Sequence, residues 1–386
     1  MTALFPDYRP AWETPEHTEL RKHAAEFFRR EATLNQERWA DQHQVDREFW
    51  NKAGDAGLLC TELPESLGGA GGDFGHDTVV VQELALSGDS AFGYGVHSTI
   101  CAHYVEDCGT EEQKQRWLPK AASGEAVFAI AMTEPGTGSD LQAVRTTAVR
   151  EGDEYVINGS KTFISNGSHC DLLIIVCKTD PGQGAKGISL IVAETDGLPG
   201  FERGRVLKKI GQHGQDTREL SFTDMRVPAA NLLGGVEGQG FYQLMRQLPR
   251  ERLSIAVGGV AAAEKAVLEA IAYTKERKAF GKPIADFQNT KFVLADAKTE
   301  VLAGKTLVDH CITLAIAGTL DAGTASMAKL WATEMQCRVI DNVLQLFGGY
   351  GYMMEYPIAQ LYAGARVQKI YGGTNEIMKE LIARGL

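Results

Sequence analysis

The sequence predicts an α+β protein with an α-β-α order: an N-terminal helical domain (1–125), a middle antiparallel β domain (126–234) and a C-terminal antiparallel helical bundle (235–386). Two observations predict this order. Apolar residues recur at helical spacing in the first third of the chain and again after residue 234. Between these regions lie short runs rich in Val, Ile, Thr and Phe, separated by Gly, Asp and Asn. A chain of 386 residues is long enough for two or three such domains.

The composition disfavours several classes of protein. With 44% hydrophobic and 23% charged residues, the chain is typical of a folded globular protein. Its net charge of −11 disfavours non-specific binding to nucleic acid, although a local basic patch can still hold a few phosphates. We expect neither a secretory signal nor a membrane span. The seven cysteines contain no CxxC pair and have no plausible His ligands beside them, so we expect reduced thiols, a cytoplasmic protein and no metal site.

Helices are expected in the first third of the chain. Apolar spacing predicts a helix over residues 16–39. Thr110, followed by Glu112 and Gln113, predicts a capped helix start. The stretch 67–72 contains four glycines and predicts a loop, since so many glycines destabilise any regular element.

The middle of the chain is predicted to form β-strands. Glu151-Gly152-Asp153 and Asn158-Gly159 have the composition of hairpin turns. No useful helix fits between the strand-like runs, which predicts an antiparallel sheet and not a βαβ array. The runs cover residues 126–133, 146–150, 155–157, 172–178, 188–194 and 219–222.

Long helices are expected after residue 235. The first of them, over residues 241–276, would be roughly 50 Å long, and Pro249 should kink it or restart it. Short links between long helices predict an antiparallel bundle. The other helical stretches cover residues 285–317, 321–347 and 374–383.

Two motifs of the β region place Gly, Thr and Ser at strand ends. They are MTEPGTGSD (132–140) and NGSKTFISNG (158–167). Their backbone N–H groups and hydroxyls can face a planar polar ligand, and an ordinary glycine-rich turn is the alternative interpretation of each. Neither motif is the GxGxxG fingerprint, so a dinucleotide bound here would not lie on a Rossmann fold.

Three further motifs lie in the C-terminal region: ERKAFGKPI (276–284), QLFGGYGYM (345–353) and IYGGTNEIM (370–378). Arg277 with Lys278 can hold a pyrophosphate, because the forked guanidinium suits phosphate contacts. The alternative is a pair of cations stabilising a helix C-terminus. The glycine pairs at 348–349 and 372–373 allow close backbone approach to a ligand, or they serve as helix C-caps.

In this order and spacing, the five motifs resemble those of the acyl-CoA dehydrogenase family over nearly the whole chain. LPRERLSIA and YGGTNEIMKELIAR are most similar to its long-chain branch. The resemblance implies an FAD cofactor, a fatty acyl-CoA substrate dehydrogenated to the trans-2-enoyl-CoA, and a place in fatty acid β-oxidation. It also implies a homotetramer, as a dimer of dimers, and electron-transfer flavoprotein as the electron acceptor.

The catalytic base implied by the resemblance is Glu251. The reaction needs a carboxylate that takes the α-proton while a hydride leaves the β-carbon for flavin N5. Many family members carry this base in a Tyr-Glu-Gly-Thr motif, where this chain has Gly372. In the long-chain and isovaleryl branches the base lies on the long helix instead. Burial of Glu251 should raise its pKa toward ~6–7, a range suited to a general base.

The residues alone leave other interpretations of these carboxylates open. Glu251 can pair with Arg250 or Arg252 on a solvated helix face. Glu376 is a rival carboxylate, although the resemblance places it facing the flavin.

Further binding roles are implied residue by residue. For FAD they fall to Ile130, Met132, Thr133, Gly138, Ser139, Phe163, Ile164, Ser165, Arg277, Phe280, Gln288, Gln345, Leu346, Gly348, Gly349, Thr374 and Glu376, some of them from a neighbouring subunit. For the acyl thioester they fall to Ser139, Tyr242, Arg252, Gly372 and Gly373. Phe163 departs from several relatives that have Trp, although a planar apolar wall is retained.

Several alternative functions share this resemblance. The substrate can be a branched or short acyl group of the isovaleryl or citronellyl type. An acyl-CoA oxidase would use the same base but pass its electrons to oxygen. A non-catalytic flavoprotein or acyl-CoA-binding subunit is a different class, and the presence of Glu251 with the flavin motifs argues against it. Acyl chain length and pathway are not encoded in these motifs.

Overall fold

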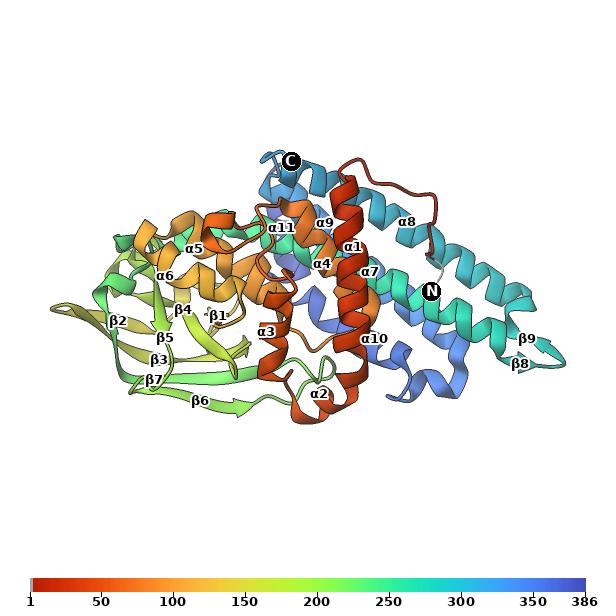
Figure 1. Ribbon diagram of the computed structural model, residues 1–386, viewed down its shortest axis with the longest axis horizontal. Helices are drawn as coiled ribbons and strands as arrows, with labels where there is room; N and C mark the ends of the chain where they lie inside the picture. Colours follow the sequence, from red (N-terminus) through yellow and green to blue (C-terminus); the bar gives the residue numbers. More distant parts are fainter. Residues whose placement is uncertain (1–2) are drawn as a thin grey trace.

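The computed structural model, which describes residues 3–386, has a β-sheet at one end, long C-terminal helices at the other, and N-terminal helices packed against both (Figure 1). The α-β-α fold class predicted from the sequence is confirmed. In this part of the chain, no helix combines the length and the apolar character needed to cross a bilayer.

The N-terminal region consists of short helices and one π-helical turn. The expected helical stretch over residues 16–39 is helical except for a break at Ala32: α1 ends at Glu31, a 3-10 turn covers Thr33–Asn35, and α2 begins at Gln36. The predicted capped start is confirmed: the Thr110 side chain accepts from Gln113 N at the start of α6. The helices are α1 (Pro15–Glu31), α2 (Gln36–Gln42), α3 (Arg47–Asp55), α4 (Phe74–Ser87), a π-helix (Gly95–Cys101), α5 (Ala102–Cys108) and α6 (Glu111–Ala122).

The middle region is a seven-stranded sheet in the order β1-β4-β2-β3-β7-β6, with β5 also paired to β4. Most pairs are antiparallel as expected, but β4 runs parallel to both β1 and β2. The strands are β1 (Val127–Ala131), β2 (Thr147–Glu151), β3 (Glu154–Ser165), β4 (Cys170–Lys178), β5 (Ile188–Glu194), β6 (Phe201–Val206) and β7 (Thr217–Pro228).

One of the two predicted hairpin turns is correct and the other is wrong. Gly152 and Asp153 form the turn between β2 and β3. Asn158-Gly159 instead lies inside β3, where the register against β7 shifts. Gly159 is needed there for space, since a Cβ on it would collide with the backbone and side chain of Thr146. The sequence pattern also missed β6, whose residues are partly exposed.

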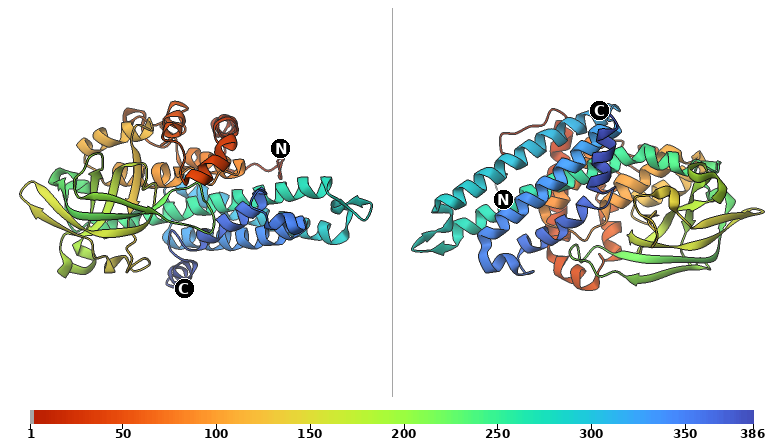
Figure 2. Two further views of the ribbon diagram at one scale, coloured as in Figure 1. Left: turned by 90° about the horizontal axis from the view of Figure 1, so that it is seen from below. Right: turned by 180° about the vertical axis from the view of Figure 1, so that it is seen from behind.

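The C-terminal region is dominated by α7 (Gly240–Glu276), α8 (Gln288–Ile316) and α9 (Ala322–Leu344), which run side by side (Figure 2). Pro249 does not restart α7, which is continuous. A small hairpin of β8 (Lys278–Ala279) and β9 (Lys282–Pro283) projects where α7 passes to α8 (Figure 1). Two shorter helices complete the region, α10 (Pro357–Ala365) and α11 (Asn375–Ala383).

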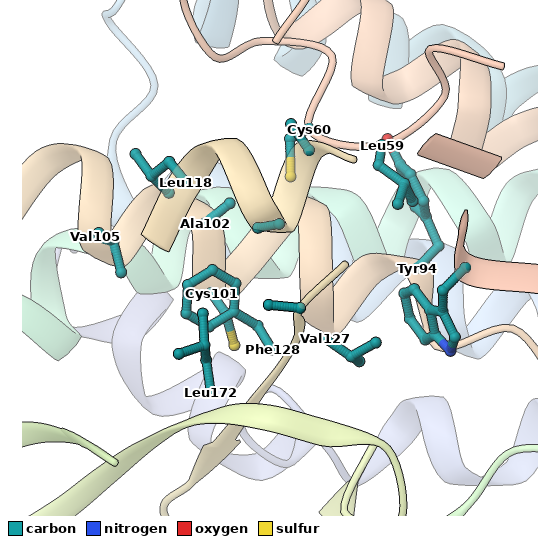
Figure 3. Packing of buried hydrophobic residues seen from close by; sticks show 14 of the residues in the cluster. Leu59, Cys60, Tyr94, Cys101, Ala102, Val105, Leu118, Val127, Phe128 and Leu172 are labelled. Atoms are coloured by element: carbon teal, nitrogen blue, oxygen red, sulfur yellow. The ribbon is translucent and has the colours of Figure 1, made fainter. Parts of the chain in front are cut away.

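A continuous apolar core joins the N-terminal helices to the sheet (Figure 3). Side chains of the π-helix and α5, among them Cys101, Ala102 and Val105, pack with Phe128 of β1 and Leu172 of β4. Because these side chains are fully or almost fully buried, α5 is held firmly between the sheet and α7. This packing restricts the side chains that α5 directs toward α7.

Candidate active site

Glu251 lies in the first third of α7 and faces α5. Its carboxylate Oε1 accepts a hydrogen bond of 2.8 Å from the hydroxyl of Tyr104, and the two residues are 5% and 0% exposed. Among the described residues, neither Arg250 nor Arg252 forms an ion pair with this carboxylate. The alternative of a solvated pair on the helix surface is therefore wrong for Glu251.

The buried setting of Glu251 changes its acidity. Burial raises its pKa from the ordinary value of 4.5 to about 7, against the opposing effects of the Tyr104 hydrogen bond and the positive charge of Arg252. A carboxylate with a pKa near the working pH can accept a proton from a weak carbon acid and later release it. The site therefore has the acidity of a general base.

Arg250 and Arg252 have hydrogen-bond partners other than this carboxylate, and these partners lie in two different parts of the protein. Arg250 is ion-paired with Glu62, donates to Thr99 O at 3.1 Å and lies 2.9 Å from His103 Nε2. These contacts tie the start of α7 to the N-terminal helices. Arg252 Nε donates to Gly372 O at 3.4 Å, which brings the Gly372-Gly373 turn onto the same part of α7.

Both glycines of that turn have positive φ, 64° for Gly372 and 93° for Gly373. Lys329 Nζ holds the turn in place by donating to Gly373 O at 2.8 Å and to Asn375 Oδ1 at 2.9 Å. A Cβ on Gly372 would collide with Cδ1 of Ile255. Since residues 251 and 255 lie on the same helix face, the turn and the Glu251 carboxylate border one region of α7.

The two motif loops of the sheet are joined at the ends of β1 and β3. Thr162 N donates to Thr133 O at 2.9 Å. Below this contact the ammonium of Lys161 is buried and donates to Met132 O at 3.0 Å, to Glu134 at 2.9 Å and to Val176 O at 2.7 Å. The sequence reasoning missed Lys161 and Glu134 as supports, although both lie within the two quoted motifs.

Phe163 directly follows Lys161 and Thr162 in β3, and its side chain faces solvent. Its side chain is 66% exposed and its φ is +61°, an uncommon value for an aromatic residue. A large exposed aromatic ring held by a strained backbone is suited to packing against a flat ligand. In the other motif loop, Gly138 leaves open space where a Cβ would stand. These features fit a flavin ring at this edge of the sheet.

A second region of predicted cofactor residues lies at the far end of α7. Arg277, Leu346, Gly348 and Gly349 line one cavity of about 490 Å³. Added Cβ atoms on Gly348 and Gly349 would meet nothing within 4 Å, so the backbone there is open to a ligand. The forked guanidinium of Arg277, together with the accessible backbone of Gly348 and Gly349, fits the diphosphate part of a dinucleotide.

The remaining predicted residues differ in how far they are buried. Ile164 is buried at the sheet end, and Thr374 caps α11 by accepting from Ile377 N at 3.4 Å. The partly buried ones are Ile130, Met132, Thr133 and Ser165, and the exposed ones are Ser139, Tyr242, Phe280, Gln288, Gln345 and Glu376.

Glu251 and the Arg277 cavity lie far apart along α7. From Glu251 to Arg277 the helix rises by about 39 Å at 1.5 Å per residue. The structure therefore places Arg277 and Phe280 at the opposite end of α7 from the part that carries Glu251.

A cluster of His17, Asp73 and His76 lies away from these regions. Nδ1 of each histidine accepts a backbone N–H, from Thr14 at 3.1 Å and from Asp73 at 3.0 Å. These bonds satisfy the first turns of α1 and α4, so the cluster is built as paired helix caps.

Comparison with known sequences decides the family. Profiles of the N-terminal, middle and C-terminal domains of acyl-CoA dehydrogenase match residues 14–125, 129–225 and 238–386. The chain belongs to the acyl-CoA dehydrogenase family. Members of this family are FAD-dependent oxidoreductases, so the expected FAD cofactor and enzyme class are confirmed.

Individual acyl-CoA dehydrogenases differ in the substrates for which they are named. The long-chain specific acyl-CoA dehydrogenase of Mus musculus is 47% identical over 371 residues, covering 96% of this chain and 86% of the mouse protein. The short-chain specific enzyme of Clostridium acetobutylicum is 40% identical over 333 residues, covering 86% and 87%. A crystal structure of acyl-CoA dehydrogenase from Geobacillus kaustophilus has a TM-score of 0.95 at 47% identity, covering 98% and 99%.

Proposed function

We propose that this acyl-CoA dehydrogenase oxidises long linear acyl-CoA thioesters and that Glu251 removes the α-proton. The observation that carries the proposal is the buried Glu251 carboxylate, with its raised pKa, opposite a glycine at position 372 that cannot accept a proton. FAD, when bound, supplies the acceptor for the β-hydride. A long-chain preference is supported by the 47% identity to the mouse enzyme and by the LPRERLSIA and YGGTNEIMKELIAR segments.

The residues of this chain perform the proton transfer and bind the substrate. Oε1 of Glu251 is held by Tyr104, which leaves Oε2 to receive the α-proton. The buried surroundings exclude water, so the carboxylate is weakly solvated and a stronger base than one on the surface. The Gly372-Gly373 turn, Arg252 and the half-exposed Tyr242 border the thioester in this proposal, with a backbone N–H of the turn polarising its carbonyl.

The assembly and the electron acceptor are part of the same proposal. We infer a homotetramer in which the Arg277 end of one chain holds the adenylate half of a neighbour's FAD, because Arg277 lies about 39 Å from Glu251 along α7 of the same chain. Electron-transfer flavoprotein as the acceptor follows from the family resemblance. A cytoplasmic location is supported by seven free cysteines, five of them buried.

The decisive test is Glu251→Gln, followed by anaerobic mixing with acyl-CoA. We expect bound FAD to be retained and flavin reduction to slow at least about a hundredfold, the lower end of acid–base contributions. Glu264→Gln is the matched control, since Glu264 is a buried glutamate on the same helix. Normal turnover by the Glu251 variant would show that the base lies elsewhere.

A panel of acyl-CoAs tests the substrate. Anaerobic bleaching of the flavin should be fastest with long linear chains, whereas faster bleaching by short or branched acyl groups would replace the long-chain assignment. Slow reoxidation in air separates a dehydrogenase from an acyl-CoA oxidase. Rapid reoxidation by oxygen would favour the oxidase.

A further inference from the structure

Tyr104 is placed to act on the proposed base. It lies on α5, 147 residues away from Glu251 in sequence, and its hydroxyl is the donor to Glu251 Oε1 at 2.8 Å. Its neighbours on the same helix, Ala102 and Val105, are buried in the core of Figure 3, so packing fixes the direction of the phenol ring. A donor held this firmly fixes the side-chain rotamer of the carboxylate that it contacts.

We propose that Tyr104 acts through Glu251 as a positioning residue, its hydroxyl held against the carboxylate so that it stabilises the ionised form inside the protein. The inference rests on the proposed role of Glu251 and deepens it. A hydrogen bond donated to a carboxylate stabilises the charged form more than the protonated form. Without Tyr104, burial alone would keep Glu251 protonated over more of the neutral range.

The charges around Glu251 leave this role to Tyr104. Three titratable groups face the carboxylate: Tyr104 from α5, Cys101 from the π-helix and Arg252 from α7. Burial raises the pKa of both Cys101 and Tyr104 well above the ordinary range, so both stay neutral. Arg252 is charged, but its Nε is directed to Gly372 O. Among residues 3–386, the side chain that donates directly to the carboxylate is Tyr104.

The test is Tyr104→Phe, which removes one oxygen and keeps the ring. We expect the acidic limb of the flavin-reduction profile to move up by about 1–2 pH units, the size of a hydrogen bond to a charged group. Reduction at pH 6.5 should then be ~10–100-fold slower, while the rate at the alkaline plateau should stay within about threefold of wild type. A parallel loss at every pH would overturn the proposal, because it would indicate misplacement of the site without a change in acidity.

Tyr94→Phe is the matched control. Tyr94 is equally buried and also donates to a carboxylate, Asp77, at 2.5 Å, but it has no contact with Glu251. It should leave the pH profile unshifted. An equal shift in both variants would overturn the proposal, because it would then reflect general loosening of the N-terminal helices.

A second measurement does not depend on turnover. Infrared difference titration follows the protonated carboxyl band that Glu251→Gln removes, and in Tyr104→Phe this band should persist to a pH about 1–2 units higher. If Glu251→Gln is inactive but the band titrates unchanged in Tyr104→Phe, the inference fails while the proposed function stands. If Glu251→Gln remains active, the proposed function itself fails.

Discussion

The two ends of α7 carry the predicted base and a predicted cofactor-binding region, and they differ in how far they are buried. Near its start, Glu251 is 5% exposed and its carboxylate is paired with Tyr104 of the same chain. At its end, Phe280 is 95% exposed on the β8–β9 hairpin beside the open cavity of Arg277. Glu251 has its hydrogen-bond partner within the same chain, whereas the ring of Phe280 is open to solvent in the described part of the chain.

This difference shows which property each end depends on. Proton transfer requires a dry and fixed environment, and the core between α5, the sheet and α7 provides it. Binding the adenylate half requires exposed donors that another molecule can reach. Substitutions at the start of α7 should therefore change acidity, while substitutions at its end should change cofactor retention.

The largest expected effect is on stability. The pKa of Glu251 is about 7 in the folded protein against 4.5 ordinarily, so the unfolded chain holds fewer protons between these values. Stability then falls as pH rises through that window, by about 3 kcal/mol in total. Glu251→Gln, which does not titrate, should be more stable than wild type by about this amount at pH 8, and most of the difference should disappear at pH 5. Urea unfolding at the two pH values measures it.

The exposed Glu376 provides the control for this stability effect. Glu376→Gln should change stability by no more than about 0.5 kcal/mol at either pH, as is usual for surface positions. A gain for Glu251→Gln that is equal at pH 5 and pH 8 would contradict a buried, titrating carboxylate.

The second prediction concerns rate in the wild-type protein. A base with a pKa of about 7 should make flavin reduction rise with pH and level off above that value. Below it, the rate should fall about tenfold per pH unit, which gives roughly a hundredfold loss at pH 5. Stopped-flow reduction across this range measures the limb. A flat profile from pH 5 to 8 would mean that no buried base limits the reaction.

Sequence reasoning predicted the fold class, the long helix and the capped start at Thr110 because those signals are local. It misplaced Asn158-Gly159 because the same dipeptide suits a turn and a bulge, and only the pairing of β3 with β7 decides between them. It missed β6 because a partly exposed strand has weak apolar alternation.

The residues of the candidate site were likewise predictable only where a local segment of sequence carries the signal. Glu251 and Arg277 were predicted from segments that resemble those of the family, LPRERLSIA and ERKAFGKPI. Tyr104 had no signal of this kind: its partner is 147 residues away, and a buried tyrosine on an apolar helix face reads as ordinary core. The Lys161–Glu134 pair was hidden for a similar reason, because it links two motifs through the interior of the sheet.

The third prediction tests the exposed end of α7. Arg277→Ala should weaken FAD binding about tenfold to a hundredfold, the size of one or two hydrogen bonds to a charged phosphate. The pH profile of the enzyme that retains FAD should not change, because Arg277 lies about 39 Å from the base along α7. Lys278→Ala, at the next exposed cation, is the control and should retain more FAD. Equal FAD retention in wild type and Arg277→Ala would remove Arg277 from the cofactor site.

The smallest effect is a partial transfer of the base to the glycine turn. Gly372 has a φ of +64°, which disfavours any side chain by roughly 1–2 kcal/mol, and Ile255 fills the space that a Cβ there would need. Gly372→Glu in a Glu251→Gln background should therefore recover little by itself. Adding Ile255→Ala makes room for the new carboxylate beside the face of α7 that carries residues 251 and 255. Flavin reduction should then be about tenfold faster than in Glu251→Gln/Ile255→Ala, a gain well below the contribution of a native base. Rapid mixing of these variants with acyl-CoA measures the gain. If the triple variant is no faster than Glu251→Gln/Ile255→Ala, a carboxylate at position 372 does not reach the α-carbon that Glu251 reaches. A base on the glycine turn then cannot replace the buried base near the start of α7.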